Sequence, residues 1–585
     1  MSGVINLFLI SIYIFFMSQY MICGIENMFI KNSEYIKYNI MIIFCFMMFL
    51  NIFIPIKNII AIFTIFLFYI LSLGMYYVHE FRGTNLNFND LKCIKTAKEV
   101  AGGYKYTIKN RFLICLLLNI FLTYVFIKNP LVRNTFREQT NFEAFEYFIR
   151  YFIRFVILVA KILIVLFLYN ILIWKISSSY FDYSLNSGEK EGYIYNFISS
   201  IPYLHKNNID EEDDEDLYEK MDFDSMITEK SDNSQADLPH IIVVMNESFG
   251  TVNRRINTNI PVTPYYDSLT GVTKGDLYVN TFGGGTANTE FEFLTSIMVG
   301  NLPYPVMPYN LLVEKNKKNN SNFKKYSLVS FLKNLGYKTM AMHPYTASNY
   351  HRDIVYRKFM FDDLVFYDNF NNKNKIRDFV SDKSMYQEII DRFEKDVENN
   401  QKLFMFGITM QNHSGYDKFD GEEVIANDDL DNTQLNSYLS LLKISDEALK
   451  DLVDYFKNRD EHVVLCVFGD HNAGFGTDTN KKYYDNNDTY EGSNAYITPY
   501  FIFDNKKCDD TIVEPTSINF LANHILKVAN IKLDKWQQFI SDLNDKVDYM
   551  NWHKLKFKNI ENMDYIDINL QQYLYYQNEY LKING

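Results

Sequence analysis

What the sequence lacks excludes several classes of protein. Its 585 residues include six cysteines but no CxxC pair, so neither a zinc ribbon nor a disulfide framework is indicated. Cys466 and Cys508 could pair in an oxidising compartment, although two separate buried thiols are the simpler interpretation. An excess of positive charge is also missing, because the formal net charge is -13. Without a basic field that gathers phosphates, nucleic acid is excluded as a partner.

Long apolar segments, by contrast, are concentrated in the first third of the chain. Five of them approach the roughly 20 residues that a helix needs to cross a bilayer. They cover about 4–23, 38–56, 59–78, 112–128 and 152–174. The first has no basic n-region and no small-residue cleavage site, so we expect a retained helix rather than a signal peptide. Lys161 interrupts the last segment and is expected to face a neighbouring helix or a polar cavity.

These segments predict a five-helix transmembrane domain over residues 1–175, because their lengths and few charges argue against a soluble helical domain. Residues 176–237 are predicted to form a juxtamembrane amphipathic helix and an acidic linker. The acidic run 210–216 is typical of a solvated linker. A metal-binding role for this run is the weaker alternative, because no calcium-loop spacing accompanies it.

The sequence pattern changes at His240, where residues 238–540 predict a doubly wound α/β domain. Short apolar runs of the kind buried in parallel sheets alternate with helical patterns. The candidate strands are 241–245, 338–342, 403–409 and 463–468, and two of the candidate helices are 326–335 and 435–457. Ligands of such domains collect at the carboxyl ends of the strands. Residues 541–585 form a C-terminal extension to which the sequence assigns no role.

Polar residues that could take part in catalysis or bind a metal follow these strands directly. Glu247 follows the first strand, and Asp470 and His471 follow the last, so loops of one sheet could bring them together. Between them, three glycines precede Thr286 at a predicted helix start, where backbone N–H groups suit a phosphoryl oxygen. A hydroxyl beside a divalent cation there would become a nucleophile. Thr289 offers a second hydroxyl, but Thr286 adjoins the glycines and is preferred.

Taken together, these motifs resemble the lipoteichoic acid synthase family of polyglycerol-phosphate transferases. The resemblance is carried by Glu-Ser at 247–248, Gly-Gly-Gly-Thr-Ala-Asn-Thr-Glu-Phe at 283–291, Asn-His at 412–413 and Gly-Asp-His at 469–471. Phe-Arg-Gly-Thr at 81–84 and Val-Ala-Gly-Gly-Tyr at 100–104 extend it into the membrane half. Members of that family are sulfatase-like enzymes of the alkaline phosphatase superfamily, anchored by five helices with the catalytic domain outside the cell.

The resemblance implies a set of site residues. The metal ligands would be Glu247, Thr286, Asp470 and His471, with Thr286 also the catalytic nucleophile. One divalent ion is implied, Mn²⁺ in the first place, with Mg²⁺ or Zn²⁺ as alternatives. The substrate-binding residues would be His343, Tyr350, Arg352 and His413. Arg352 would fork onto phosphate oxygens, and His413 would donate to a phosphoryl oxygen or protonate the leaving alkoxide. Tyr350 departs from the tryptophan expected there.

The function implied is transfer of a phosphoglycerol group from a phosphatidylglycerol-like phospholipid to an envelope glycan or a glycerol-phosphate polymer, through a phospho-threonine intermediate. A phosphoethanolamine transferase and a phosphodiesterase of the same superfamily are the alternatives, and a membrane-bound scaffold without activity is a further one. A true sulfatase is disfavoured, because Thr286–Glu290 lacks the C/S-x-P-x-R setting that formylglycine requires.

The orientation of the large domain is where two arguments disagree. The loop after the third segment carries seven basic residues between Arg82 and Arg111. The positive-inside rule taken alone would place this loop, and with it the large domain, in the cytoplasm. The resemblance implies the opposite, and we adopt it: a multi-pass protein of the cell membrane with an extracellular catalytic domain.

Overall fold

The structure is a computed structural model, and its secondary structure and side chains are described for part of the chain. The described residues are 2–25, 27–54, 57–82, 85–93, 106–128, 144–178, 187–201, 238–252, 255–299, 307–314, 327–398, 401–545, 547–550 and 555–557, with gaps at 417–418, 420, 422, 428–429, 431, 476, 485–493 and 508–509. The acidic run 210–216, the segments 83–84 and 100–104, Cys508 and most of the C-terminal extension lie outside them.

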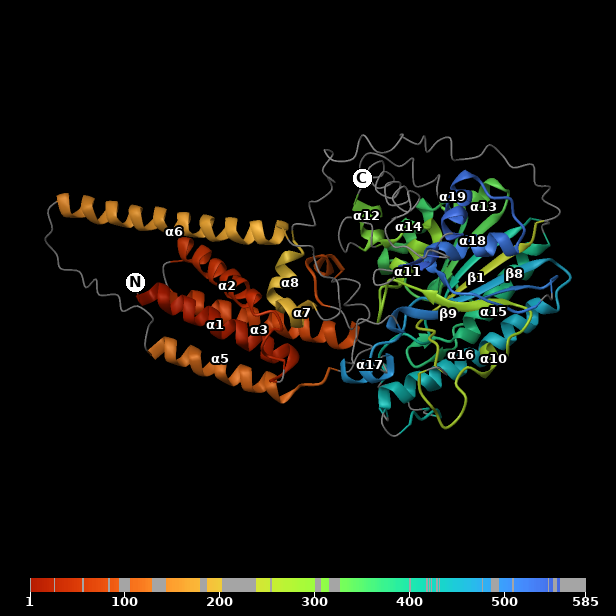
Figure 1. Cartoon of the computed structure of the whole chain (residues 1–585), viewed down its shortest axis with the longest axis horizontal. Coiled ribbons are helices and arrows are strands. Elements are labelled where there is room, and N and C mark those ends of the chain that lie inside the picture. Colours follow the sequence, from red (N-terminus) through yellow and green to blue (C-terminus); the bar gives the residue numbers. More distant parts are fainter. Residues whose placement is uncertain are drawn as a thin grey trace. The chain divides into compact units, whose positions relative to one another are not determined.

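The chain divides into two compact units. The first, here the membrane unit, comprises Met1–Lys92 and Tyr106–His205, and the second, here the sheet unit, comprises Cys93–Lys105 and Lys206–Gly585. Figure 1 shows the first as a set of helices and the second as a sheet with helices around it. The predicted domain boundaries at 175, 237 and 540 stay predictions.

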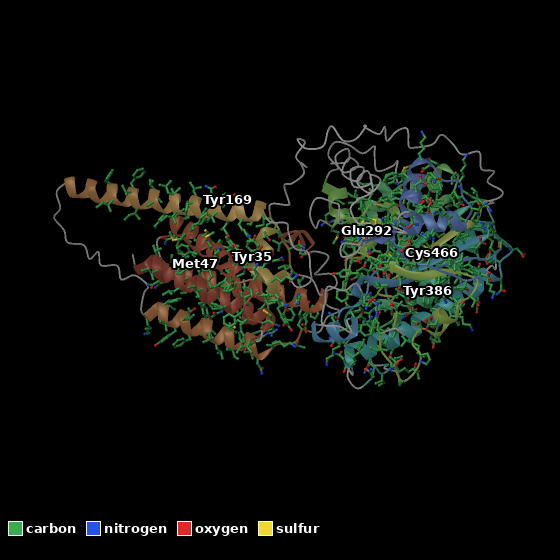
Figure 2. All side chains as sticks on the ribbon, in the orientation of Figure 1. Tyr35, Met47, Tyr169, Glu292, Tyr386 and Cys466 are labelled. Atoms are coloured by element: carbon green, nitrogen blue, oxygen red, sulfur yellow. The ribbon has the colours of Figure 1, made fainter. Side chains whose placement is uncertain are left out.

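The membrane unit contains five long helices, as predicted. They are α1 (Ser2–Cys23), α2 (Glu34–Phe53), α3 (Lys57–Arg82), α5 (Asn110–Lys128) and α6 (Ala144–Ser178). Within the described residues, five helices are long and apolar enough to cross a membrane. Figure 2 shows Met47 among the helices and Tyr169 on α6, where its ring is 55% exposed. Such an exposed side chain suits lipid contact. Lipid tails are themselves apolar, so an apolar side chain gains little by moving from lipid into the protein interior.

Polar contacts tie this helical unit together at a few points. Lys161 Nζ on α6 donates to the Asn51 carbonyl on α2 at 3.1 Å, so the charged residue faces a neighbouring helix, as expected. The short helix α8 (Tyr193–Ser199) packs against α2, and α7 (Ser187–Glu191) packs against α8. The Asn39 amide donates to the Glu191 carbonyl at 2.7 Å and accepts from the Tyr195 N–H at 2.8 Å. The juxtamembrane stretch therefore packs against the membrane helices.

The sheet unit is built on a nine-stranded sheet. Its strands are β1 (His240–Asn246), β2 (Thr273–Tyr278), β3 (Lys338–His343), β4 (Asp363–Phe366), β7 (Leu403–Ile408), β8 (Val463–Gly469), β9 (Ile497–Asp504), β10 (Ile512–Val513) and β11 (Thr516–Ser517). The order is β10-β2-β9-β8-β1-β7-β3-β4, with β11 beside β2. Two hairpins complete the unit: β5 (Lys375–Ile376) with β6 (Phe379–Val380), and β12 (Val547–Met550) with β13 (Leu555–Phe557).

The helices of this unit lie on both faces of the sheet (Figure 1). They are α10 (Pro264–Ser268), α11 (Thr286–Thr295), α12 (Pro308–Glu314), α13 (Leu328–Asn334), α14 (Arg352–Lys358), α15 (Asp382–Val397), α16 (Thr433–Lys457), α17 (Thr477–Tyr484), α18 (Ile518–Val528) and α19 (Lys535–Asn544). Alternate residues of β1 serve the two faces: Ile241 and Val243 belong to the core that α11 and α18 cover. The predicted α/β fold with covered faces is confirmed.

The sheet is mixed, whereas the four strands predicted from the sequence were expected to form a parallel sheet. β8, β1, β7, β3 and β4 run parallel, whereas β9 is antiparallel to both β8 and β2. The parallel register pairs Asn246 with Gly469 and Met245 with Ile408. The carboxyl ends of β1, β7 and β8 are therefore level, and the residues that follow them share one edge of the sheet.

Candidate active site

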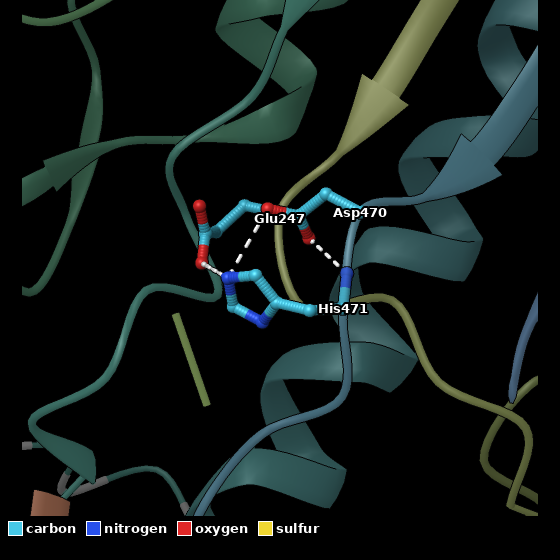
Figure 3. A group of neighbouring side chains, drawn as sticks. All are labelled: Glu247, Asp470 and His471. Atoms are coloured by element: carbon cyan, nitrogen blue, oxygen red, sulfur yellow. Dashed lines mark hydrogen bonds and ion pairs between the residues drawn. The ribbon is translucent and has the colours of Figure 1, made fainter. Parts of the chain in front are cut away.

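The candidate active site lies at this edge, where the loops after β1 and β8 meet. Glu247 follows Asn246, and Asp470 and His471 follow Gly469, so the strand register places them side by side. All three side chains are buried. Each offers one ligand atom, and these atoms lie within 4.8 Å of one another. Figure 3 shows the three side chains pointing toward one another.

Thr286 joins this group from α11. Its Oγ1 lies 3.5 Å from Glu247 Oε2 and 3.5 Å from His471 Nε2. The three preceding glycines all have positive φ, and Gly285, the helix N-cap, has φ 89°. Side-chain residues rarely adopt these angles, so the glycines permit the sharp turn that starts the helix at Thr286. The structure thus brings together the four residues that the sequence predicted as ligands.

The electrostatics of the four-residue group fit a divalent cation. Burial and the neighbouring Asp470 carboxylate hold the pKa of Glu247 well above its usual range. Burial likewise raises the pKa of Asp470, against the lowering effect of His471. Asp470 Oδ2 lies 3.2 Å from His471 Nε2 and has no hydrogen-bond partner among the described residues. Two buried carboxylates, an imidazole and a hydroxyl are a donor set for Mn²⁺, Mg²⁺ or Zn²⁺.

Thr289, the alternative nucleophile, occupies a different position. It is buried on α11, and its Oγ1 donates to the Asp470 carbonyl at 2.9 Å. Thr281 Oγ1 lies 2.9 Å from the same hydroxyl. Thr289 therefore supports the loop after β8, whereas the Thr286 hydroxyl faces the carboxylate and imidazole groups.

The two predicted substrate histidines follow neighbouring strands. His343 ends β3, and its Nδ1 lies 3.3 Å from the Ile408 carbonyl. Burial and the nearby Arg352 hold the pKa of His343 well below its usual range. Burial, Arg377 and His471 lower the pKa of His413 to about 3. Both imidazoles are therefore neutral at pH 7 and can donate a hydrogen bond to an anionic oxygen.

Arg352 has contacts that the sequence analysis did not foresee. Its guanidinium pairs with Glu290: Nε donates to Oε1 at 3.1 Å and to Oε2 at 3.2 Å, and Nη2 also donates to Oε1. Nη1 donates to Asn349 Oδ1 at 3.0 Å, and the side chain is 1% exposed. The predicted fork onto a substrate phosphate is thus occupied here by an internal carboxylate.

Tyr350 is a neighbour of this buried pair. Its φ is 53°, and its ring centroid lies 4.9 Å from Arg352 Cζ. The ring is partly buried and packs against the hydrophobic core. These contacts give Tyr350 a packing role, and its predicted substrate contact stays a prediction.

Sequence reasoning missed Arg377, which comes from the turn of the β5–β6 hairpin. Its guanidinium donates to three backbone carbonyls: Gln411 at 2.6 Å, His413 at 2.8 Å and Gly415 at 3.1 Å. The loop that carries His413 is therefore held by a side chain from a separate hairpin. The sequence around Arg377 reads as an ordinary charged turn, so no local pattern indicates this contact.

A chain of hydrogen bonds behind Glu247 was also missed. The Glu247 N–H donates to Thr409 Oγ1 at 3.0 Å, and that hydroxyl donates to Asn246 Oδ1 at 3.1 Å. The Asn246 amide donates to Ser445 Oγ at 3.0 Å, and the Ser445 hydroxyl donates to Asp382 Oδ2. All five residues are buried, so the chain fixes the position of Glu247 from within the core.

The fold and this geometry define a class: an α/β protein with a buried threonine hydroxyl, two carboxylates and an imidazole gathered at the carboxyl ends of its central strands. The Sulfatase family model matches residues 239–531, which is half of the chain. The chain therefore belongs to the sulfatase family.

Several known proteins are similar to parts of this chain. A candidate cyclic beta-1,2-glucan modification protein of Rhizobium meliloti (strain 1021) is 29% identical over 333 residues, covering 55% of this chain and 50% of that protein. The phosphoglycerol transferase GacH of Streptococcus pyogenes, solved with sn-glycerol-1-phosphate, is 21% identical, covers 61% of this chain and 87% of that one, and has a TM-score of 0.48. The phosphoethanolamine transferase EptA of Neisseria meningitidis is 13% identical, covers 90% and 95%, and has a TM-score of 0.48. The chain spans half the length of the Rhizobium meliloti protein.

Proposed function

We propose that this protein is a membrane-anchored phosphoglycerol transferase with Thr286 as its nucleophile. The observation that carries the proposal is the Thr286 hydroxyl, 3.5 Å from both Glu247 Oε2 and His471 Nε2 in a buried group of ligands. Glu247, Thr286, Asp470 and His471 would hold a divalent cation. When bound, the cation would lower the pKa of a neighbouring hydroxyl and offset charge on phosphoryl oxygens.

The proposed reaction has two steps. In the first step the bond between Thr286 Oγ and phosphorus forms, the bond to the diacylglycerol oxygen breaks, and the threonine proton is lost while that oxygen gains one. In the second step an acceptor hydroxyl takes the group and Thr286 regains its proton. Since His413 is neutral, its role is to donate a hydrogen bond to a phosphoryl oxygen rather than to act as a strong acid.

The membrane helices support a lipid donor. Five helices are long and apolar enough to cross a membrane, and phosphatidylglycerol-like lipids would be available as donors in a bilayer. The Rhizobium meliloti relative is described by glucan modification, which supports a glycan or a glycerol-phosphate polymer as the acceptor. An extracellular sheet unit is part of the proposal, since envelope polymers are assembled there.

The test is the mass of a covalent adduct on Thr286. Full-length protein is incubated with Mn²⁺ and phosphatidylglycerol without acceptor, and its peptides are analysed by mass spectrometry. Wild type should carry a phosphoglycerol group on the 286 peptide and release diacylglycerol, whereas Thr286→Ala should do neither. Loss of the nucleophile should lower the transfer rate by about 10⁴-fold or more.

Thr295→Ala is the matched control, because Thr295 lies on the same helix and its hydroxyl bonds only to nearby backbone: it donates to the Phe291 carbonyl at 2.6 Å and accepts from the Ile297 N–H at 3.2 Å among the described residues. This variant should form the adduct normally. An adduct on Thr286→Ala protein would refute the assignment. A phosphoethanolamine adduct from phosphatidylethanolamine, with none from phosphatidylglycerol, would replace the donor, and release of free glycerol phosphate without transfer would indicate a phosphodiesterase.

A further inference from the structure

The loop that carries His413 is held in place by one side chain from the β5–β6 hairpin. This loop, residues 411–415, follows β7, whose carboxyl end is level with that of β1 and its site residues. The Arg377 guanidinium donates to the carbonyls of Gln411 at 2.6 Å, His413 at 2.8 Å and Gly415 at 3.1 Å. Carbonyls inside a protein that lack a partner cost free energy, so the guanidinium stabilises this conformation of the loop.

Aromatic rings connect the same hairpin to the imidazole of His413. The Arg377 guanidinium lies over two rings, with its Cζ 5.3 Å from the Phe379 centroid and 5.6 Å from the Tyr416 centroid. Such contacts favour a cation. The Phe379 ring lies 5.1 Å from the His413 ring. The hairpin therefore contacts both the backbone and the side chain at position 413.

Arg377 occupies a backbone position that favours glycine. β5 and β6 pair Ile376 with Phe379, which leaves Arg377 and Asp378 as a two-residue turn. Turns of this length need a positive φ at their first residue, and the φ of Arg377 is 56°. Glycine adopts such an angle most easily. An arginine in this strained position indicates that its side chain contributes something that glycine would not.

We propose that Arg377 is a positioning residue of the transfer reaction: by holding the 411–415 loop, it fixes the place from which His413 contacts the phosphoryl group. The inference rests on the proposed function, in which His413 donates a hydrogen bond to a phosphoryl oxygen. The Arg377 guanidinium is turned to backbone carbonyls, so it acts through His413 rather than on the substrate. Loss of Arg377 should therefore lower the transfer rate only while His413 is present.

The test is a double-mutant cycle on the rate at which the Thr286 adduct forms. Full-length wild type, Arg377→Gly, His413→Gln and the double variant are incubated with Mn²⁺ and phosphatidylglycerol. Arg377→Gly removes the guanidinium and suits the turn, so its urea midpoint should stay near that of wild type. Its rate at saturating donor should fall about 10²-fold, because a small misplacement of a positioned group can cost this much. The half-saturating donor concentration should change little.

The double variant separates positioning from a general structural role. In His413→Gln protein, the Arg377→Gly substitution should lower the rate less than about threefold, because the effects of independent residues multiply whereas those of residues acting as one do not. Arg377→Lys should fall between wild type and Arg377→Gly, since an ammonium group donates to carbonyls but lacks the planar fork. It replaces the glycine variant in the cycle if that variant unfolds.

Arg459→Gly is the matched control. Arg459 lies before the amino end of β8, and its guanidinium is also over two rings, those of Phe393 at 5.8 Å and Tyr455 at 5.5 Å. This variant should form the adduct at the wild-type rate. Losses that multiply fully in the double variant overturn the inference, and so does a wild-type rate in Arg377→Gly or in His413→Gln. Wild-type protein that forms no adduct overturns the proposed function instead, so the two failures are distinguishable.

Discussion

Buried polar groups are satisfied differently in the membrane unit and the sheet unit. In the membrane unit, buried hydroxyls mostly bond within their own helix: Ser11 donates to the Leu7 carbonyl at 2.9 Å, Thr64 to Ile60 at 2.7 Å and Ser72 to Phe68 at 2.6 Å. In the sheet unit, buried polar side chains bond to one another over long sequence distances, as from Asn246 through Ser445 to Asp382. Tyr386 and Glu292, labelled in Figure 2, are two of these buried polar side chains of the sheet unit.

The difference follows from what each unit packs against. A helix in hydrocarbon satisfies its own backbone, and a hydroxyl that bonds four residues back depends on no other element. The carboxyl ends of the β-strands must instead hold charged groups in fixed positions inside a core, which requires partners from several elements. Single substitutions should therefore disturb the sheet unit much more than the membrane unit, and three predictions test this contrast.

The largest effect is expected at the buried ion pair of Arg352 and Glu290. Arg352→Met should leave the Glu290 carboxylate buried with only the Tyr309 and Tyr356 hydroxyls, which lie at 2.9 and 2.6 Å, as donors. Breaking such a pair typically costs about 3–5 kcal/mol. The measurement is the urea midpoint of full-length protein in detergent, followed by tryptophan fluorescence, to which Trp536, buried in the sheet unit, contributes.

The double variant Glu290→Leu with Arg352→Met separates pairing from packing. Replacing both charges removes the unpaired carboxylate, so the double variant should be more stable than Arg352→Met alone. If Arg352→Met unfolds at the wild-type midpoint, the buried pair does not hold the loop after β3, and the contrast between the units loses its strongest case.

The next effect is a pH dependence that comes from Glu292. Burial raises the pKa of this carboxyl to about 8, against bonds from the Val299 N–H and the Asn280 amide. The folded state therefore binds the proton more tightly than the unfolded state, and the stability from this group falls as pH rises from its unfolded pKa toward 8. The slope should approach 1.4 kcal/mol per pH unit, or about 2–3 kcal/mol between pH 6 and 8.

Glu292→Gln mimics the protonated carboxyl and should remove this part of the pH dependence. Unfolding midpoints at pH 6, 7 and 8 are compared between the variant and wild type. The two should be similar at pH 6, and the variant should be more stable at pH 8. Parallel pH profiles for the two proteins would show that Glu292 does not titrate in this range.

The parts of the fold and site that the sequence predicted are those with a local signal. β1 and β8 are continuous apolar runs, and Glu247 and Asp470 come directly after them. Strand register alone then places these side chains at one edge of the sheet. Thr286 could be placed as well, because three glycines before a helical pattern indicate a sharp turn into a helix start.

The parts that could not be predicted depend on tertiary contacts. β2 contains Lys274, Gly275 and Asp276, which weaken a strand pattern in the sequence. Glycine is needed at 275, because a Cβ there would lie 2.0 Å from the Glu514 carbonyl oxygen, which comes from a distant part of the chain. Arg377 acts on the His413 loop from a charged turn 36 residues away. The pairing of Arg352 with Glu290, 62 residues earlier, has no local signal in the sequence, and the phosphate contact of Arg352 stays a prediction.

The smallest effect tests the contrast with two matched substitutions, Ser445→Ala and Ser72→Ala. Both serines are buried, but the Ser445 hydroxyl joins the Asn246 amide to the Asp382 carboxylate, whereas the Ser72 hydroxyl bonds only to the Phe68 carbonyl of its own helix. Loss of Ser445 removes the hydroxyl donor of the buried Asp382 carboxylate and one of the bonds of the Asn246 amide, which still donates to Tyr386 OH at 3.0 Å. The cost should be about 1–3 kcal/mol. Loss of Ser72 should cost less than about 0.6 kcal/mol, the average found for hydrogen bonds between membrane helices. Unfolding in detergent, followed by protease sensitivity of each unit, measures both. Equal losses of unfolding free energy in the two variants would contradict the contrast. They would mean that a buried hydroxyl contributes as much to a membrane helix as to the polar network of the sheet unit.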